Sequence, residues 1–169
     1  MPVTPLHPLA LMFLYFKDKR RIDPLALTVS ASFIDLEPLY YLLIGEPLDH
    51  RIWHGFALAW TVYPILITIG VYIVEHLFEG RLRSTYNALW LKPNQVQYSS
   101  LTIYLCSLVG GASHIFFDMF THKNMPYVIY PLANGNPFYI GTASIIVEVT
   151  VILLVIYSLL YWIKGKLSH

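Results

Sequence analysis

Long apolar runs with almost no charge are the feature that most constrains this chain. Residues 55–78, 101–120 and 138–163 each reach the roughly 20 residues that a helix needs to span a bilayer. Residues 24–45 are also long enough but carry two carboxylates near the middle. Residues 4–16 are short for a full crossing at about 1.5 Å per residue. The runs predict an all-α integral membrane protein, a bundle of about five transmembrane helices.

Composition and charge placement support this prediction. Of the 169 residues, 56% are hydrophobic and 12% are charged, against roughly 25% charged in an ordinary soluble domain. Nine of the 11 Lys and Arg residues fall in the first and third connections and the tail. Because cytoplasmic loops are enriched in these residues, we expect the N-terminus outside and the C-terminus inside. Residues 1–169 would form a single transmembrane domain in the cell (inner or plasma) membrane.

The net charge of +1 gives no bulk attraction to nucleic acid, so no nucleic-acid partner is expected. Histidines and carboxylates inside the apolar runs are more informative, because such groups are costly in a membrane and therefore mark functional candidates. Placed by depth in this topology, residues from four helices reach the outer level of the bundle. They are His7, Asp35, Glu37, His50, His54, His114, Asp118 and His122.

The fourth long helix has the most regular arrangement of these groups. His114, Asp118 and His122 are spaced four residues apart, so they form one stripe if the helix continues to His122. His50 and His54 have the same spacing. Mixed imidazole and carboxylate ligands suit divalent ions, with Zn²⁺ favoured and Mn²⁺ or Fe²⁺ as alternatives. The pattern predicts a metal site that faces the outer side.

The carboxylates of the second run need a local distortion to reach such a site together. Asp35 and Glu37 are two residues apart, about 200° around an ideal helix. Pro38 lacks a backbone donor and disfavours helix at Glu37. Both carboxylates could therefore turn inward.

Other charged groups in the runs have simpler interpretations. Glu75 and Glu79 fall at the inner end of the third helix, where we expect them to extend to the interface or to pair with Arg81 and Arg83. For His76 we expect a structural hydrogen bond between helices. These residues should lie far from the metal site.

Four short segments, in this order, resemble the YdjM-like membrane-bound metal-dependent hydrolases and related archaeal and bacterial membrane families. The segments are Thr4-Pro5-Leu6-His7-Pro8, Ile34-Asp35-Leu36-Glu37-Pro38, His50-Arg51 with His54-Gly55, and Ser113-His114-Ile115-Phe116-Phe117-Asp118-Met119-Phe120-Thr121-His122.

The resemblance covers the first three-quarters of the chain. It implies a helical metallohydrolase, in a superfamily proposed to include zinc-dependent phospholipase C and related nucleases. The positions that match metal ligands are His7, Asp35, His54, His114 and Asp118.

Two positions depart from the pattern of that family. Ile34 stands where the family often has a proline, and Leu58 stands where it usually has a second histidine after the one that matches His54. Either His50 substitutes for that histidine or the site has lost a ligand. The second departure bears on catalysis more than on fold.

We therefore expect a metal-dependent hydrolase that acts on a small phosphoester or lipid-like ester at the membrane surface. Glu37 or His122 would act as general base, within hydrogen-bond reach of the attacking water, and His50 is a further catalytic candidate. Two other functions stay open. The cluster could belong to an ion or proton pathway, or it could hold a metal in a scaffold without turnover.

Overall fold

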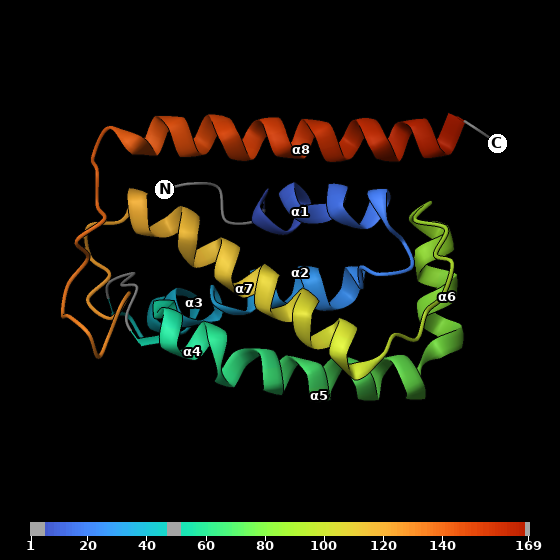
Figure 1. Ribbon diagram of the computed structural model, residues 1–169, viewed down its shortest axis with the longest axis horizontal. Helices are drawn as coiled ribbons and strands as arrows, with labels where there is room; N and C mark the ends of the chain where they lie inside the picture. The colour runs from blue at the N-terminus through green and yellow to red at the C-terminus, as the bar shows by residue number, and fades with distance from the viewer. Residues whose placement is uncertain (1–5, 47–51, 168–169) are drawn as a thin grey trace.

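The computed structural model describes residues 6–46 and 52–167, and this part of the chain is helical without any β-strand (Figure 1). In chain order the elements are α1 (Leu6–Lys17), α2 (Pro24–Phe33), α3 (Leu36–Leu43), the 3₁₀ turn η1 (Ile52–His54), α4 (Phe56–Trp60), α5 (Val62–Leu77), α6 (Glu79–Ala88), α7 (Ser100–Thr121) and α8 (Ala143–Leu167).

Helix α7 is the centre of the bundle. It packs against α2 and α5, while α8 lies along α1 on the opposite side (Figure 1). Ile103 and Ile115, near the two ends of α7, are both fully buried. One face of α7 is therefore buried along the length of the helix.

The predicted helical class is confirmed, and two helices have the length and apolarity to cross a membrane, α7 with 22 residues and α8 with 25. Helices α5 and α6 would together form a third span, but α6 turns away from α5 by 92°. Helices α1 and α2 are apolar and shorter, with 12 and 10 residues.

The two ends of the bundle differ in charge. The α1–α2 connection, the α6–α7 connection and the end of α8 lie together at one end (Figure 1); we call it the basic end, because it carries Lys19, Arg20, Lys92, Lys164 and Lys166. The start of α1 and the end of α7 lie at the other end, here the histidine end. The connections rich in Lys and Arg, which alternate along the sequence with connections poor in them, therefore lie together at one end of the bundle.

The prediction of one continuous helix over residues 24–45 is wrong, since the chain forms two helices, α2 and α3, with a break between them. Pro38 has no N–H to donate to Ile34, and the Glu37 N–H donates to that carbonyl oxygen instead, at 3.2 Å. This tighter turn leaves Pro38 in the first turn of α3, where its missing donor costs little. The break places Asp35 between two helices.

The helix predicted over residues 55–78 is also interrupted, at Thr61 between α4 and α5. Pro64 lies in the first turn of α5 and cannot donate to Trp60. Helix α6 was not predicted. Its sequence is polar, and it runs across the basic end rather than along the bundle (Figure 1).

A close approach of α2 and α7 fixes the middle of the bundle. A Cβ atom at Gly110 would overlap the Ser30 hydroxyl and lie 2.6 Å from the Leu27 carbonyl oxygen. Only glycine allows the two backbones to come this near. Because α2 begins at the basic end and leads to Asp35, this contact helps to set where Asp35 meets α7.

The expectation for Glu75 is wrong. Its side chain is fully buried, and one of its oxygens accepts the Tyr98 N–H at 2.9 Å. Arg83 pairs with Glu79 at 3.0 Å, as predicted. His76 is exposed and bonds to a carbonyl of its own helix, not to a neighbouring helix.

Candidate metal centre

Five side chains from four parts of the chain meet at the histidine end. His7 lies in the first turn of α1, Asp35 lies at the α2–α3 break, His54 ends η1, and His114 and Asp118 are one turn apart on α7. Two groups of possible metal-ligand atoms, each within 4.8 Å of one another, share His114. One group adds His7 and Asp118, and the other adds Asp35 and His54. All five predicted ligands are therefore brought together.

His114 is the central residue of the cluster. Its Nδ1 lies 2.7 Å from the Ala31 carbonyl oxygen, so Nδ1 carries a proton and donates it there. Its Nε2 lies 3.1 Å from Asp118 Oδ2 and 3.3 Å from Asp35 Oδ1, in a geometry that makes no hydrogen bond. In its neutral form the ring would therefore point a lone pair at two carboxylates. This arrangement calls for a cation between them, either a proton or a metal ion.

His7 gives the same indication independently. It is 3% exposed, and neither ring nitrogen has a hydrogen-bond partner among the residues that the structure describes. Its ring lies 4.6 Å from that of His114 and stacks on Phe117 at 6.0 Å. A buried polar atom without a partner costs about 1–3 kcal/mol, a cost that metal coordination would remove.

His54 is held by a carboxylate on the side away from the cluster. Its Nδ1 lies 2.8 Å from Glu37 Oε2, and Glu37 Oε1 accepts the Trp53 N–H at 3.1 Å. The other ring nitrogen, Nε2, lies 3.9 Å from Asp118 Oδ2. A carboxylate that fixes the ring and tautomer of a histidine in this way is a common support of metal-binding imidazoles.

His122 lies at the margin of the cluster, just past the end of α7. Its Nδ1 is 3.8 Å from Asp118 Oδ1 and 2.8 Å from the Thr121 hydroxyl. Burial lowers the pKa of His122, although the Asp118 carboxylate opposes this shift. A neutral, partly exposed imidazole beside the cluster can accept a proton.

The loop between α7 and α8 packs against the same end. Phe56 donates its N–H to the Val128 carbonyl oxygen at 3.0 Å, and a Cβ atom at Gly55 would lie 2.7 Å from the Tyr127 carbonyl oxygen. Asn136 donates to the His122 carbonyl oxygen at 2.7 Å. These contacts hold the η1 turn, and with it His54, against the end of α7.

Two further residues, His50 and Leu58, bear on the predicted site. His50 lies outside the described residues. Leu58, which stands where the resemblance calls for a histidine, packs against the apolar core around α7.

The donor set and its spacing fit a divalent ion. Ligand atoms around a tetrahedral ion with bonds of about 2.0–2.2 Å lie roughly 3.4 Å apart. The distances between the nitrogen and oxygen atoms that face the centre are 3.1, 3.3 and 3.9 Å. The histidine end could therefore hold a metal ion with small side-chain adjustments.

A second buried polar group, which the sequence did not reveal, lies towards the basic end. Asp23 and Glu75 are fully buried, and their carboxyl groups lie close together. Asp23 Oδ2 and Glu75 Oε1 each lack a hydrogen-bond donor among the described residues, so the pair calls for a shared proton. The Tyr86 hydroxyl nearby is buried without a partner among the described residues. We call Asp23, Glu75, Tyr86 and Tyr98 the acid cluster. In the sequence, Asp23 before Pro24 is typical of a helix cap, and in the structure it does cap α2. Nothing in the local sequence indicates that it also meets Glu75, 52 residues later.

A family model described as "Domain of unknown function (DUF4184)" matches residues 1–160. No curated protein and no solved structure matches the chain.

Proposed function

The chain belongs to the DUF4184 family, and we propose from its site that it is a membrane-embedded metal-dependent hydrolase. Its substrate would be a phosphoester or lipid-like ester at the membrane surface. The observation that carries the proposal is the unpartnered, buried nitrogen of His114 between Asp35 and Asp118, with His7 beside it. The resemblance to the YdjM-like hydrolases supports the same reaction class.

We place the protein in the membrane with five crossings, with the basic end towards the cytoplasm and the histidine end outside. The apolar lengths of α7 and α8 and the gathering of basic residues at one end support this topology. Cysteine tags near Arg83 and Lys166 should react from the cytoplasmic side, and a tag near Lys123 from outside. Reaction of tags near Arg83 and Lys123 from the same side would contradict it.

We assign roles to the site residues from their positions. His7, Asp35, His54, His114 and Asp118 would bind the metal, with Zn²⁺ favoured and Mn²⁺ or Fe²⁺ as alternatives. A divalent ion supplies Lewis acidity and a more acidic water.

The general base is a choice between Glu37 and His122. Both Glu37 oxygens already have partners in Trp53 and His54, which favours an orienting role. His122 is nearer the surface and contacts Asp118, which favours it as the base.

A proton pathway is a second candidate, and the acid cluster is the observation that favours it. Asp23 and Glu75 provide buried titratable groups between the histidine end and the basic end, where the sequence had offered few. Reconstituted vesicles distinguish the two functions. A pathway predicts proton flux that falls in Glu75→Gln, whereas a hydrolase predicts no flux and no effect of Glu75→Gln on turnover.

The decisive activity test uses purified protein loaded with zinc and assayed on bis-p-nitrophenyl phosphate and p-nitrophenyl phosphate. We expect metal-dependent turnover that Asp118→Asn abolishes. Ser113→Ala, on the same helix but outside the cluster, should retain turnover. Bound metal without turnover on either ester in the wild type would favour the non-catalytic scaffold.

A further inference from the structure

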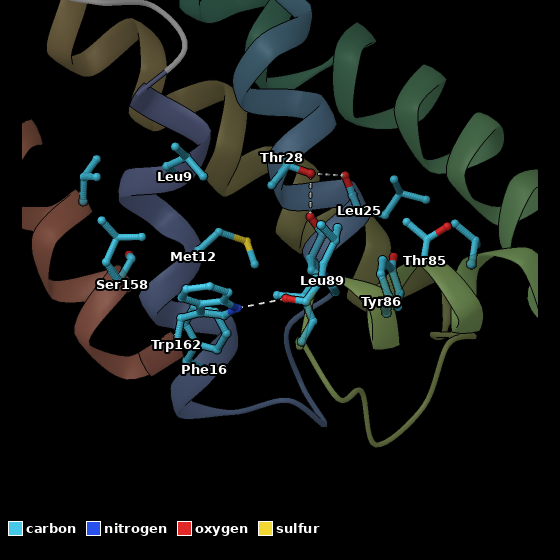
Figure 2. Close-up of a pocket in the computed structure, with 15 residues that line it drawn as sticks. Leu9, Met12, Phe16, Leu25, Thr28, Thr85, Tyr86, Leu89, Ser158 and Trp162 are labelled. Carbon is cyan, nitrogen blue, oxygen red and sulfur yellow. Dashed lines mark hydrogen bonds between the residues drawn. The ribbon is translucent and has the colours of Figure 1, made fainter. Parts of the chain in front are cut away.

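The cavity of interest lies away from the metal centre, between α1, α2, α6 and α8. It has a volume of about 480 Å³. Figure 2 shows Leu9, Met12 and Phe16 along one side, Leu25 and Leu89 opposite, and Trp162 at one end. The wall is almost entirely hydrocarbon.

Three polar side chains in this wall are already bonded within the protein, and the Tyr86 hydroxyl is buried within the acid cluster. The Thr28 hydroxyl donates to a carbonyl of its own helix at 2.7 Å, and Ser158 Oγ accepts a backbone N–H of α1 at 2.9 Å. Trp162 donates its ring N–H to the Leu89 carbonyl oxygen at 2.8 Å (Figure 2). The cavity therefore has little to offer a polar ligand and suits a hydrocarbon chain.

A smaller, cationic pocket of about 250 Å³ adjoins this cavity at the basic end. Phe16 and Trp162 line both spaces, and Lys19 and Lys164 line only the smaller one. The Lys19 ammonium group is held in place by the Leu91 carbonyl oxygen at 2.6 Å. The order along the bundle is thus hydrocarbon wall, then aromatic rings, then positive charge.

This order is complementary to a phospholipid that lies in the membrane leaflet at the basic end. Acyl chains are apolar, indole rings favour the interface, and the phosphate level is where lysines attract anionic lipids. We propose that the two pockets together form a binding site for one anionic phospholipid, with an acyl chain between α1, α2, α6 and α8 and its phosphate at Lys19 and Lys164. The proposal needs the membrane placement given above but not hydrolase activity.

The test compares the retention of phosphatidylglycerol and phosphatidylcholine, with identical acyl chains, by native mass spectrometry of the full chain in detergent. We expect the wild type to retain phosphatidylglycerol in preference, by about fivefold for each lysine that reaches the phosphate. Lys164→Gln should reduce that preference, and Lys123→Gln, at the histidine end, should not.

A second pair of variants tests the acyl chain. Thr85 lines the cavity on α6 (Figure 2), so Thr85→Trp should fill it and reduce the retention of either lipid several-fold. Ser84→Trp adds the same ring to the neighbouring residue, outside the cavity wall, and should retain lipid as the wild type does.

Equal retention of the two lipids by the wild type would overturn the proposal, as would equal retention by the two tryptophan variants. Thermal midpoints in lipid-free detergent show whether Thr85→Trp is folded. If it is not, the comparison of Lys164→Gln with Lys123→Gln decides the matter.

Discussion

The metal centre and the acid cluster are both buried polar groups of one small bundle, yet they solve the burial of charge in different ways. Around His114, imidazoles and carboxylates point at a common centre, and His7 has no partner among the described residues. In the acid cluster, Leu25 donates its N–H to Asp23 and Tyr98 donates its N–H to Glu75, both at 2.9 Å. A single proton can satisfy the remaining contact between those two carboxyl groups.

The difference teaches that burial alone does not identify a metal site. Carboxyl groups and phenols without an imidazole can remain neutral in a low-dielectric interior, because protonation removes the charge. Imidazole nitrogens that face carboxylate oxygens bring acceptors together and leave a position for a cation. Substitutions in the two clusters should therefore have different effects on metal binding and on pH dependence.

Asp118→Asn should weaken Zn²⁺ binding by more than about 100-fold, because even residues that only orient ligands are worth about 10–100-fold. Asp23→Asn makes the same chemical change in the acid cluster and should leave affinity unchanged within about twofold, a margin of about 0.4 kcal/mol. Titration against a chelator of known affinity measures both. Equal losses in the two variants would break the comparison.

Glu37→Gln distinguishes an orienting carboxylate from a general base. If Glu37 orients His54, Zn²⁺ affinity should fall by about 10–100-fold. If Glu37 is the base, turnover should fall by about 10²–10⁴-fold while the metal stays bound. The hydrogen bonds to Trp53 and His54 favour the first result, and metal affinity measured beside turnover separates the two.

The acid cluster should make folding stability depend on pH. Burial raises the pKa of Asp23 to about 6, against about 3.9 in an unfolded chain. The folded protein therefore holds a proton that the unfolded chain releases between these values. The contribution of Asp23 to folding stability should be largest below about pH 4 and should fall by about 2–3 kcal/mol as the pH rises to about 6.

Thermal unfolding of the wild type and Asp23→Asn between pH 4 and 7 checks this dependence. An asparagine cannot ionise, so the variant should lose this part of the pH profile while titration of the histidines affects both proteins alike. Superimposable profiles would show that Asp23 keeps an ordinary pKa.

Gly110→Ala should destabilise the bundle by about 1–3 kcal/mol, since the added methyl group overpacks the α2–α7 contact. Gly165→Ala is the matched control, because a Cβ atom there meets open space. Alanine at Gly165 should be neutral or stabilising by up to about 1 kcal/mol. Equal thermal midpoints for the two variants would contradict a tight contact between α2 and α7 at Gly110.

Much of this arrangement could be predicted from local features of the sequence. Long apolar runs indicated α7 and α8, and the four-residue spacing of His114 and Asp118 placed both on one face of α7. The ordered His and Asp segments of the resemblance indicated that His7, Asp35 and His54 belong with them. These predictions rest on periodicity and on residue types that are rare inside membranes.

The parts that were missed depend on contacts between distant residues. Asp23 and Glu75 are each unremarkable locally, and only the packing of α2 beside α5 brings them together. The breaks at Asp35 and Thr61 arise from prolines, but the proline positions do not say how far the chain turns. The 92° turn into α6 likewise follows from tertiary packing rather than from a pattern in its own residues.

Metal binding by imidazole and carboxylate ligands at the histidine end can be measured by X-ray absorption spectroscopy of the zinc-loaded wild-type protein. We expect bound zinc with nitrogen and oxygen neighbours at about 2.0–2.2 Å and the outer-shell scattering of imidazole rings, lost together in His114→Ala. A protein that takes up no zinc, or zinc without imidazole ligands, would contradict this expectation.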